Sequence, residues 1–258
     1  MNFLKKIIFK FKNKISFYFL PKVKNYSEAE KYSITKNRAN YDSNYLSNYR
    51  FKKTENFIIN DGNLLQNPSS TMLLYVVNLF MKKNPGKIPK FVDYGGACGE
   101  SIFLLNSIFG ETIFKNSWII ESPNHVKVAK EYKFFNKIQF ANNFSEILDK
   151  TEIDIFFSSC AIHYLKNPYY PLEIAAENQI PYVCLTRNNF SLKPSINVQL
   201  SRLSSNGTGQ HLEEFIDKNI YYPVSSLSES RIIEIFSKKK YYINFQKKGT
   251  QSGVINKI

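Results

Sequence analysis

Cysteine and histidine are scarce in this chain, which limits the chemistry it can perform. Its 258 residues include three histidines and three cysteines, Cys98, Cys160 and Cys184. An odd number of widely spaced cysteines supports neither a disulfide framework nor a zinc site. We therefore expect no metal site and a reducing, cytoplasmic location. We interpret the thiols as small apolar side chains near strand ends, because no nearby histidine marks any of them as a nucleophile.

Long apolar runs are also missing. Lysines interrupt the first twenty residues every few positions, so this segment is neither a convincing signal peptide nor a membrane span. On a helical wheel its apolar residues share one face that contains no lysine, which predicts a basic amphipathic helix over residues 1–25. Two interpretations stay open. Either residues 1–20 lie on an anionic membrane surface, at the inner face of the membrane, or the helix packs on its own domain.

Acidic residues are the third deficit. The chain has 21 Asp and Glu against 35 Lys and Arg, and its formal net charge is +14. A surplus of this size suggests a polyanionic partner, either a nucleic acid or a membrane surface. Composition alone does not distinguish between the two.

The pattern of apolar and polar residues changes at Asn84-Pro85-Gly86. Before this break, residues 26–86 form a polar lead-in segment of expected helices and loops, with an apolar helix over 71–81 that Ser70 is expected to cap. After it, short apolar runs alternate with helical stretches, which is typical of a parallel sheet. Strands are expected at 90–93, 117–121, 138–141, 153–158 and 181–186, and helices at 101–107, 125–132, 144–149 and 170–178.

This alternation predicts one α/β domain over residues 87–258. The expected architecture is a Rossmann-like, doubly wound, mostly parallel sheet with a helical N-terminal extension. Residues 188–226, rich in Ser and Asn, interrupt the rhythm and are too long for an ordinary connection. We expect them to form a lid or substrate insertion. A helix at 229–237 and a strand at 241–246 resume the pattern.

A Gly-rich turn follows the first expected strand, at Asp93-Tyr94-Gly95-Gly96-Ala97-Cys98-Gly99. Small residues let the backbone approach a ligand, and the following helix offers free N–H groups. A dinucleotide fingerprint needs a small residue at its sixth position, where this chain has Glu100. A carboxylate beside two phosphates is unfavourable, whereas S-adenosylmethionine carries no phosphate. We therefore predict S-adenosylmethionine as the cofactor. The predicted ligands in the turn are Asp93, Gly95, Gly96, Ala97 and Gly99.

The ends of the following strands supply further predicted cofactor ligands. Glu121 can accept the hydroxyl protons of an adenosine ribose. Asn142 and Asn143 either bind the adenine edge through their amides or simply form a turn. Ser122 and Ser159, near the second and fourth strand ends, complete the predicted cofactor set.

The chain resembles a family of S-adenosylmethionine-dependent methyltransferases that are often encoded among bacterial surface-polysaccharide genes. The resemblance covers about residues 26–245. It is carried by Val92 to Ala97, Trp118 to Glu121, Ser158 to Leu165 and Asn167-Pro168, and more loosely by Ala39-Asn40-Tyr41-Asp42, Arg187, Gln199 and Tyr222-Pro223. The chain departs from the family at Asn40, where glycine is expected, and in an insertion-like stretch over 207–218. The resemblance implies O-methylation of a capsule or O-antigen precursor, and it makes Tyr41 a candidate substrate residue.

Methyl transfer depends mainly on positioning, but a hydroxyl acceptor benefits from a base. His163, just after the fourth strand, is either that base or a structural residue, and His211 in the expected lid is a second candidate. His125 is expected to shape the adenosine pocket. Arg187, at the end of the fifth strand, pairs either with an anionic acceptor such as a phosphate or uronate, or with a carboxylate at the sheet edge.

Two other functions compete with this one. A nucleic-acid methyltransferase would suit the basic charge. Enzymes that methylate base amino groups, however, resemble one another in an Asn-Pro-Pro-Tyr-like tetrapeptide, where this chain has Ser158-Ser159-Cys160-Ala161. Nucleic acid is therefore not the expected partner. A non-catalytic scaffold in membrane-associated glycan assembly stays open, although Gly95, Gly99 and Glu121 favour cofactor binding. The expected acceptor is a small molecule or glycan, and the sequence does not predict the acceptor atom or the oligomeric state.

Overall fold

The structure of the chain is a computed structural model. It describes residues 20–37, 42–60, 62–67, 69–238, 241–247 and 252–257, and for 242–247 and 252–257 it describes the backbone alone. The predicted amphipathic helix, up to residue 19, and the candidate substrate residue Tyr41 lie outside the described residues. Within the described ranges, no helix has the length and apolar character needed to cross a membrane.

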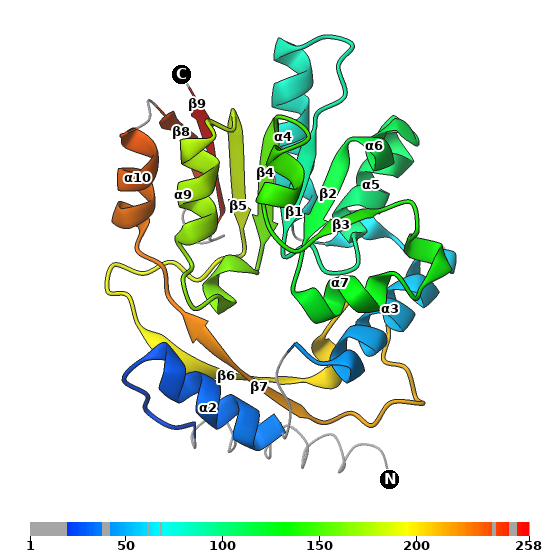
Figure 1. Ribbon diagram of the computed structural model, residues 1–258, viewed down its shortest axis with the longest axis vertical. Coiled ribbons are helices and arrows are strands. Elements are labelled where there is room, and N and C mark those ends of the chain that lie inside the picture. Colours follow the sequence, from blue (N-terminus) through cyan, green and yellow to red (C-terminus); the bar gives the residue numbers. More distant parts are fainter. Residues whose placement is uncertain are drawn as a thin grey trace.

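The described strands form a central seven-stranded sheet in the order β3-β2-β1-β4-β5-β9-β8 (Figure 1). They are β1 (Phe91–Tyr94), β2 (Ser117–Ile120), β3 (Gln139–Ala141), β4 (Ile155–Ser159), β5 (Tyr182–Thr186), β8 (Tyr241–Lys247) and β9 (Ser252–Lys257). The first five are parallel, and β9 runs antiparallel to both β5 and β8. The predicted Rossmann-like fold with a mostly parallel sheet is confirmed.

Helices cover both faces of this sheet, because its strands are apolar on both sides. Successive strand residues point to opposite faces, so in β1 Phe91 lies in one apolar core and Val92 in the other. The first core receives side chains from α4 (Ser70–Lys83), α5 (Glu100–Phe109), α6 (Thr112–Lys115) and α7 (Pro123–Ala129). The second receives side chains from α8 (Ser145–Leu148), α9 (Tyr170–Glu177) and α10 (Glu229–Ser237).

The strand order reverses between β1 and β4. From β1 the chain proceeds outward to β2 and β3, whereas β4 and β5 lie on the other side of β1. Open parallel sheets bind ligands in the crevice at such a reversal, outside the carboxyl ends of the strands. A ligand is therefore expected where β1 and β4 end.

A second, two-stranded sheet comes from the expected insertion at 188–226. In it, β6 (Ile196–Arg202) pairs antiparallel with β7 (Asn219–Ser225), and α2 (Tyr26–Asn37) packs along both strands (Figure 1). The Asn37 side chain makes the pair of hydrogen bonds with β7 that a neighbouring strand would make. Its amide donates to the Tyr221 carbonyl at 2.6 Å and accepts from the Tyr221 N–H at 2.9 Å. The N-terminal extension thus covers the insertion.

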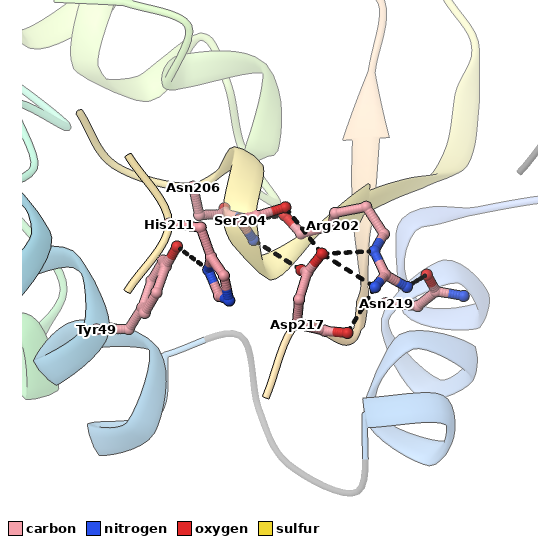
Figure 2. Close-up of polar contacts among 7 residues, drawn as sticks. All are labelled: Tyr49, Arg202, Ser204, Asn206, His211, Asp217 and Asn219. Atoms are coloured by element: carbon pink, nitrogen blue, oxygen red, sulfur yellow. Dashed lines mark hydrogen bonds and ion pairs between the residues drawn. The ribbon is translucent and has the colours of Figure 1, made fainter. Parts of the chain in front are cut away.

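A polar network closes the connection between β6 and β7 (Figure 2). Asp217 accepts hydrogen bonds from the Ser204 N–H at 2.9 Å, the Ser204 hydroxyl at 3.0 Å and Arg202 Nε at 3.1 Å. Burial raises the pKa of Asp217, but these hydrogen bonds outweigh it and hold the pKa below its ordinary value. Asn206 donates to the Arg202 carbonyl at 2.8 Å and so fixes the same turn.

Lys53, on α3 (Asn44–Ile59), holds this connection from the other side. The residue is only 2% exposed, and its Nζ donates to the carbonyls of Ser204, Asn206 and Gly207 at 2.8, 3.1 and 3.0 Å. An ammonium group has three donors, so its hydrogen-bonding capacity is fully used. A small apolar core joins the same elements and contains Leu46, Tyr49, Leu203, Ile220 and Tyr222.

The prediction that Ser70 caps α4 is wrong by one position. The helix begins at Ser70, and Ser69 occupies the N-cap without a side-chain cap hydrogen bond. The Ser70 hydroxyl instead donates to the Leu64 carbonyl at 2.8 Å. It therefore joins the helix to the 3-10 turn Leu64–Gln66.

Replacing Lys53 tests the link between α3 and the insertion. We expect Lys53→Met to lower the free energy of unfolding by about 1–3 kcal/mol, because three buried or part-buried carbonyls lose their donor. The matched control is Lys52→Met, which removes a salt bridge to Glu214 between half-exposed side chains and a cation–π contact with Phe215, and should cost about 0–1 kcal/mol. Urea denaturation of both variants measures the difference, and equal losses would contradict the assignment.

Candidate functional site

A cavity of about 510 Å³ lies at the carboxyl edge of the central sheet, where the strand order reverses. Its size is that of a site for a cofactor or small substrate. Residues that follow β1, β2, β3, β4 and β5 line it, together with residues from α3, from the start of α4 and from the connection between β6 and β7. The Gly-rich turn after β1 is at its centre.

Close packing explains the small residues of this turn. Gly95 has a φ of 72°, and a Cβ added to it would lie 2.2 Å from the Ala161 side chain that follows β4. Gly99, at the N-cap of α5, has a φ of 87°, and its added Cβ would lie 2.4 Å from Ile138. Gly95, Gly96 and Ala97 line the cavity, whereas the lining does not include Gly99. The role of Gly99 in this structure is therefore helix–sheet packing.

Ala97 is held on both of its backbone polar groups. Its N–H donates to Glu121 Oε1 at 3.2 Å, and its carbonyl accepts from His125 Nε2 at 3.0 Å. The other carboxylate oxygen of Glu121 accepts from the Ser122 N–H at 2.9 Å. These contacts restrain a residue whose φ of 47° lies in the left-handed region, which is uncommon for non-glycine residues.

His125 joins the turn to α3. Its Nδ1 accepts from the Ser47 hydroxyl at 3.2 Å, and its ring stacks on Phe51 with centroids 4.6 Å apart. Burial lowers the pKa of His125, so the ring is neutral near pH 7 and carries its proton on Nε2. The ring lines the cavity. Its place matches the expected role of shaping the pocket.

Carboxylates gather on the β1–β2 side of the cavity. Asp93 is buried, accepts a hydrogen bond from the Ser101 hydroxyl, and has its pKa raised to about 7, first by burial and then by the charges of Glu100 and Glu121. Glu100 accepts from the hydroxyls of Thr54 and Thr208. Asp42 accepts from the Ser122 hydroxyl at 2.6 Å. This half of the cavity suits a cationic ligand and disfavours a phosphate.

The two predicted asparagines lie in different places. Asn142, after β3, lines the cavity. The lining does not include Asn143, whose side chain accepts from the Ser145 hydroxyl at 2.6 Å and donates to Glu146 at 3.2 Å. These contacts belong to the turn before α8. Of the two roles that the sequence left open for Asn143, they match the turn and not the adenine edge.

Cys160 follows β4 and lines the cavity, with a φ of 54°. The interpretation that no histidine lies near a cysteine is wrong here, because His163 Nε2 is 3.9 Å from Cys160 Sγ. His163 Nδ1 donates to Asn188 Oδ1 at 3.1 Å. Burial lowers the pKa of His163 to about 4, with the Arg187 charge acting in the same direction. The ring is buried and is not part of the cavity lining, but it contacts two residues that are, Cys160 and Tyr164, and its centroid lies 4.1 Å from that of Tyr164.

The remaining predicted residues divide between the cavity and the insertion. Ser159 lines the cavity, and its hydroxyl lies 2.5 Å from that of Ser69. Arg187, after β5, also lines it with an exposed side chain. His211 contacts the Tyr49 hydroxyl through Nδ1 at 2.9 Å (Figure 2), and the lining does not include it.

Comparisons with known proteins locate this geometry within a known fold. No family model and no curated protein sequence matches the chain. Among solved structures, DesVI from Streptomyces venezuelae matches with a TM-score of 0.52 at 10% identity, over 80% of this chain and 97% of DesVI. CalS10, an amino pentose methyltransferase from Micromonospora echinaspora solved with S-adenosylmethionine bound, gives 0.50 at 10% identity, over 73% and 91%. The sugar N-methyltransferase KedS8 from Streptoalloteichus gives 0.50 at 8%, over 74% and 88%.

The chain has the fold of these methyltransferases. At such low identity the likeness concerns the fold, so the chemistry has to be argued from the residues of this cavity. Among the described residues, no cluster of His, Cys, Asp and Glu could hold a metal ion.

Sequence reasoning missed the cavity residues that come from outside the methyltransferase-fold core. They are Ser47, Arg50, Leu64, Asn67, Ser69, Ser70 and Leu73 from the lead-in segment, and Ser205, Gly207 and Thr208 from the insertion. No local motif marks them, because each reaches the cavity through tertiary packing of α3, α4 and the β6–β7 connection. One sequence feature pointed to these segments: Glu100, an ionisable residue at the first position of α5, which needs hydrogen-bond partners there.

Proposed function

We propose that this protein is an S-adenosylmethionine-dependent methyltransferase. The observation that carries the proposal is Glu121, held at the end of β2 beside the Gly-rich turn, in a cavity that is acidic on this side. Two backbone N–H groups fix the carboxylate. Each of its oxygens keeps capacity to accept a ribose hydroxyl proton. The fold shared with CalS10 and KedS8 supports the same proposal.

The charges around the turn favour this cofactor over a dinucleotide. S-adenosylmethionine supplies a methyl group already activated by its sulfonium charge; its α-ammonium and α-carboxylate offset each other, so the ligand keeps a net positive charge. Asp93 and Glu100 lie on the same side of the cavity as Glu121 and attract such a ligand. Two phosphates in the same place would be repelled. Asn142 faces the cavity after β3, where an adenine edge can use its amide.

The acceptor side of the cavity provides positioning and little acid–base chemistry. His163, with its pKa near 4, is neutral and a weak base, and it lies behind the lining residues Cys160 and Tyr164. Its contacts with Cys160 and Asn188 hold the sharp turn after β4. The geometry therefore favours a positioning role for His163, since methyl transfer gains most from the alignment of the acceptor.

A sugar hydroxyl is the proposed acceptor, on a capsule or O-antigen precursor. The resemblance of the sequence to methyltransferases of surface-polysaccharide genes supports the hydroxyl and the precursor. The fold shared with an amino pentose methyltransferase and a sugar N-methyltransferase supports only the sugar. The proposed location is the cytoplasm, with residues 1–20 on the inner face of the membrane.

Calorimetric titration tests the cofactor. S-adenosylmethionine and S-adenosylhomocysteine should bind with dissociation constants of about micromolar order, and NAD should not bind. Glu121→Ala should weaken S-adenosylhomocysteine about 10- to 100-fold, on the scale of a charged hydrogen bond. Glu173→Ala, which removes a surface ion pair on α9, is the control and should bind normally. Unchanged affinity in Glu121→Ala would remove Glu121 from the site, and binding of NAD alone would reject the proposal.

The pH dependence of binding tests Asp93. Its pKa of about 7 means that the carboxyl is largely protonated, and so neutral, in acid. A cationic ligand prefers the ionised form, so binding releases a proton, and the affinity for S-adenosylmethionine should rise between about pH 5.5 and 7. Asp93→Asn should remove this rise. A flat profile in the unmodified protein would show that Asp93 does not face the positive charge of the ligand.

A further inference from the structure

The side of the cavity opposite Glu121 has its own electrostatic character. Arg187 directly follows β5, lines the cavity and has an exposed side chain. Within the described part of the chain, its guanidinium makes no ion pair. Its φ of 56° is left-handed, a conformation that costs an arginine about 1 kcal/mol or more. The backbone at Arg187 is thus held in a strained form that presents a cation with no carboxylate partner.

A helix N-terminus faces the same part of the cavity. α4 has 14 residues, and its N-cap, Ser69, makes no side-chain cap hydrogen bond. Ser69, Ser70 and Leu73 of this first turn line the cavity. The N–H groups of Ser69 and Ser70 already donate to Asn67, so it is the dipole of the helix that attracts negative charge here.

Arg187 and this helix end lie at neighbouring strand ends. The Ser69 hydroxyl is 2.5 Å from that of Ser159, the last residue of β4. Ser159 pairs with Thr186, the last residue of β5, and Arg187 comes next in the chain. The guanidinium, the two hydroxyls and the start of α4 therefore border one region of the cavity.

The lining of this region contains no carboxylate. The acidic lining residues are Asp42, Asp93, Glu100 and Glu121. Two of them belong to β1 and the start of α5, Glu121 follows β2, and Asp42 is hydrogen-bonded to Ser122 beside it. The carboxylates of the lining thus lie at β1 and β2, where Arg50 of α3 also lines the cavity near His125, whereas Arg187 lies at β4, β5 and α4 with no carboxylate beside it in the lining. A methyl acceptor with a negative group would be oriented by this field.

We propose that the acceptor carries an oxyanion, a carboxylate or a phosphate, and that Arg187, Ser69, Ser159 and the N-terminus of α4 bind it. This inference rests on the proposed methyltransferase function and specifies its substrate class as anionic sugars. Arg187 provides a planar fork that matches either group in two parallel hydrogen bonds. The anionic group is then held at β5, and a hydroxyl of the same sugar points toward the Gly-rich turn.

The experiment uses the full chain saturated with S-adenosylhomocysteine. Glucuronic acid, glucose 1-phosphate and glucose are titrated calorimetrically as probes. Both anionic sugars should bind at least about 10-fold more tightly than glucose, as expected for a charge-assisted contact. The tighter of the two identifies the oxyanion as a carboxylate or a phosphate. No measurable binding of either anionic sugar would overturn the inference.

Two substitutions connect that preference to the residues. Arg187→Gln should remove the advantage of the anionic sugars while leaving the affinity for S-adenosylhomocysteine within about twofold. Arg231→Gln, which removes a surface arginine paired with Glu173 and Glu234, should change neither affinity. An Arg187→Gln variant that keeps the preference would refute the site. Failure of S-adenosylhomocysteine to bind the unmodified chain would instead refute the methyltransferase proposal, so the two failures are distinguishable.

Discussion

Side chains from two other elements hold the N–H and the carbonyl of Ala97, and the shape of the cavity depends on this restraint. Glu121 at the end of β2 accepts from the N–H, and His125 on α7 donates to the carbonyl. His125 is in turn fixed by Ser47 and Phe51 of α3. The left-handed turn after β1 is thus connected to the second strand and to the N-terminal extension. A change in any of these contacts would move the backbone that faces the cofactor.

The N-terminal extension and the insertion complete the cavity together. Lys53 of α3 holds the β6–β7 connection by three carbonyls, and Thr54 and Thr208 meet on Glu100 at the start of α5. The part of the cavity wall that meets on Glu100 is therefore built from two segments that are far apart in the sequence, α3 and the β6–β7 connection. This arrangement explains why a carboxylate occupies the first position of α5. Glu100 accepts hydrogen bonds from Thr54 and Thr208, and it adds to the negative charge on the cofactor side.

The sequence predicted the parallel strands, the Gly-rich turn and the position of Glu121 at a strand end, because each depends on a local pattern: apolar runs, small residues at a sharp turn, and an acidic residue after a strand. It did not predict β6 and β7. Apolar residues do alternate with polar ones in β6, at Ile196, Val198 and Leu200, but the surrounding stretch 188–226 is rich in Ser and Asn and indicated a lid. Packing on α2 and the contacts of Asn37 with Tyr221 complete the two strands. The sequence indicated a filling role for Cys160 and, for His163, either a catalytic base or a structural residue, with no contact between the two. The tight turn after β4 brings the Cys160 thiol to 3.9 Å from His163 Nε2, and the sequence analysis did not predict this contact.

The structure of the complex with S-adenosylhomocysteine tests the central claim most directly. The account predicts that the ribose hydroxyls bind the Glu121 carboxylate, with the adenine near Asn142 and the amino acid part beside Asp93. The sulfur should point toward the side of Ser159 and Arg187. A ligand that lies outside this cavity, or one whose ribose is bound on the Arg187 side, would contradict it.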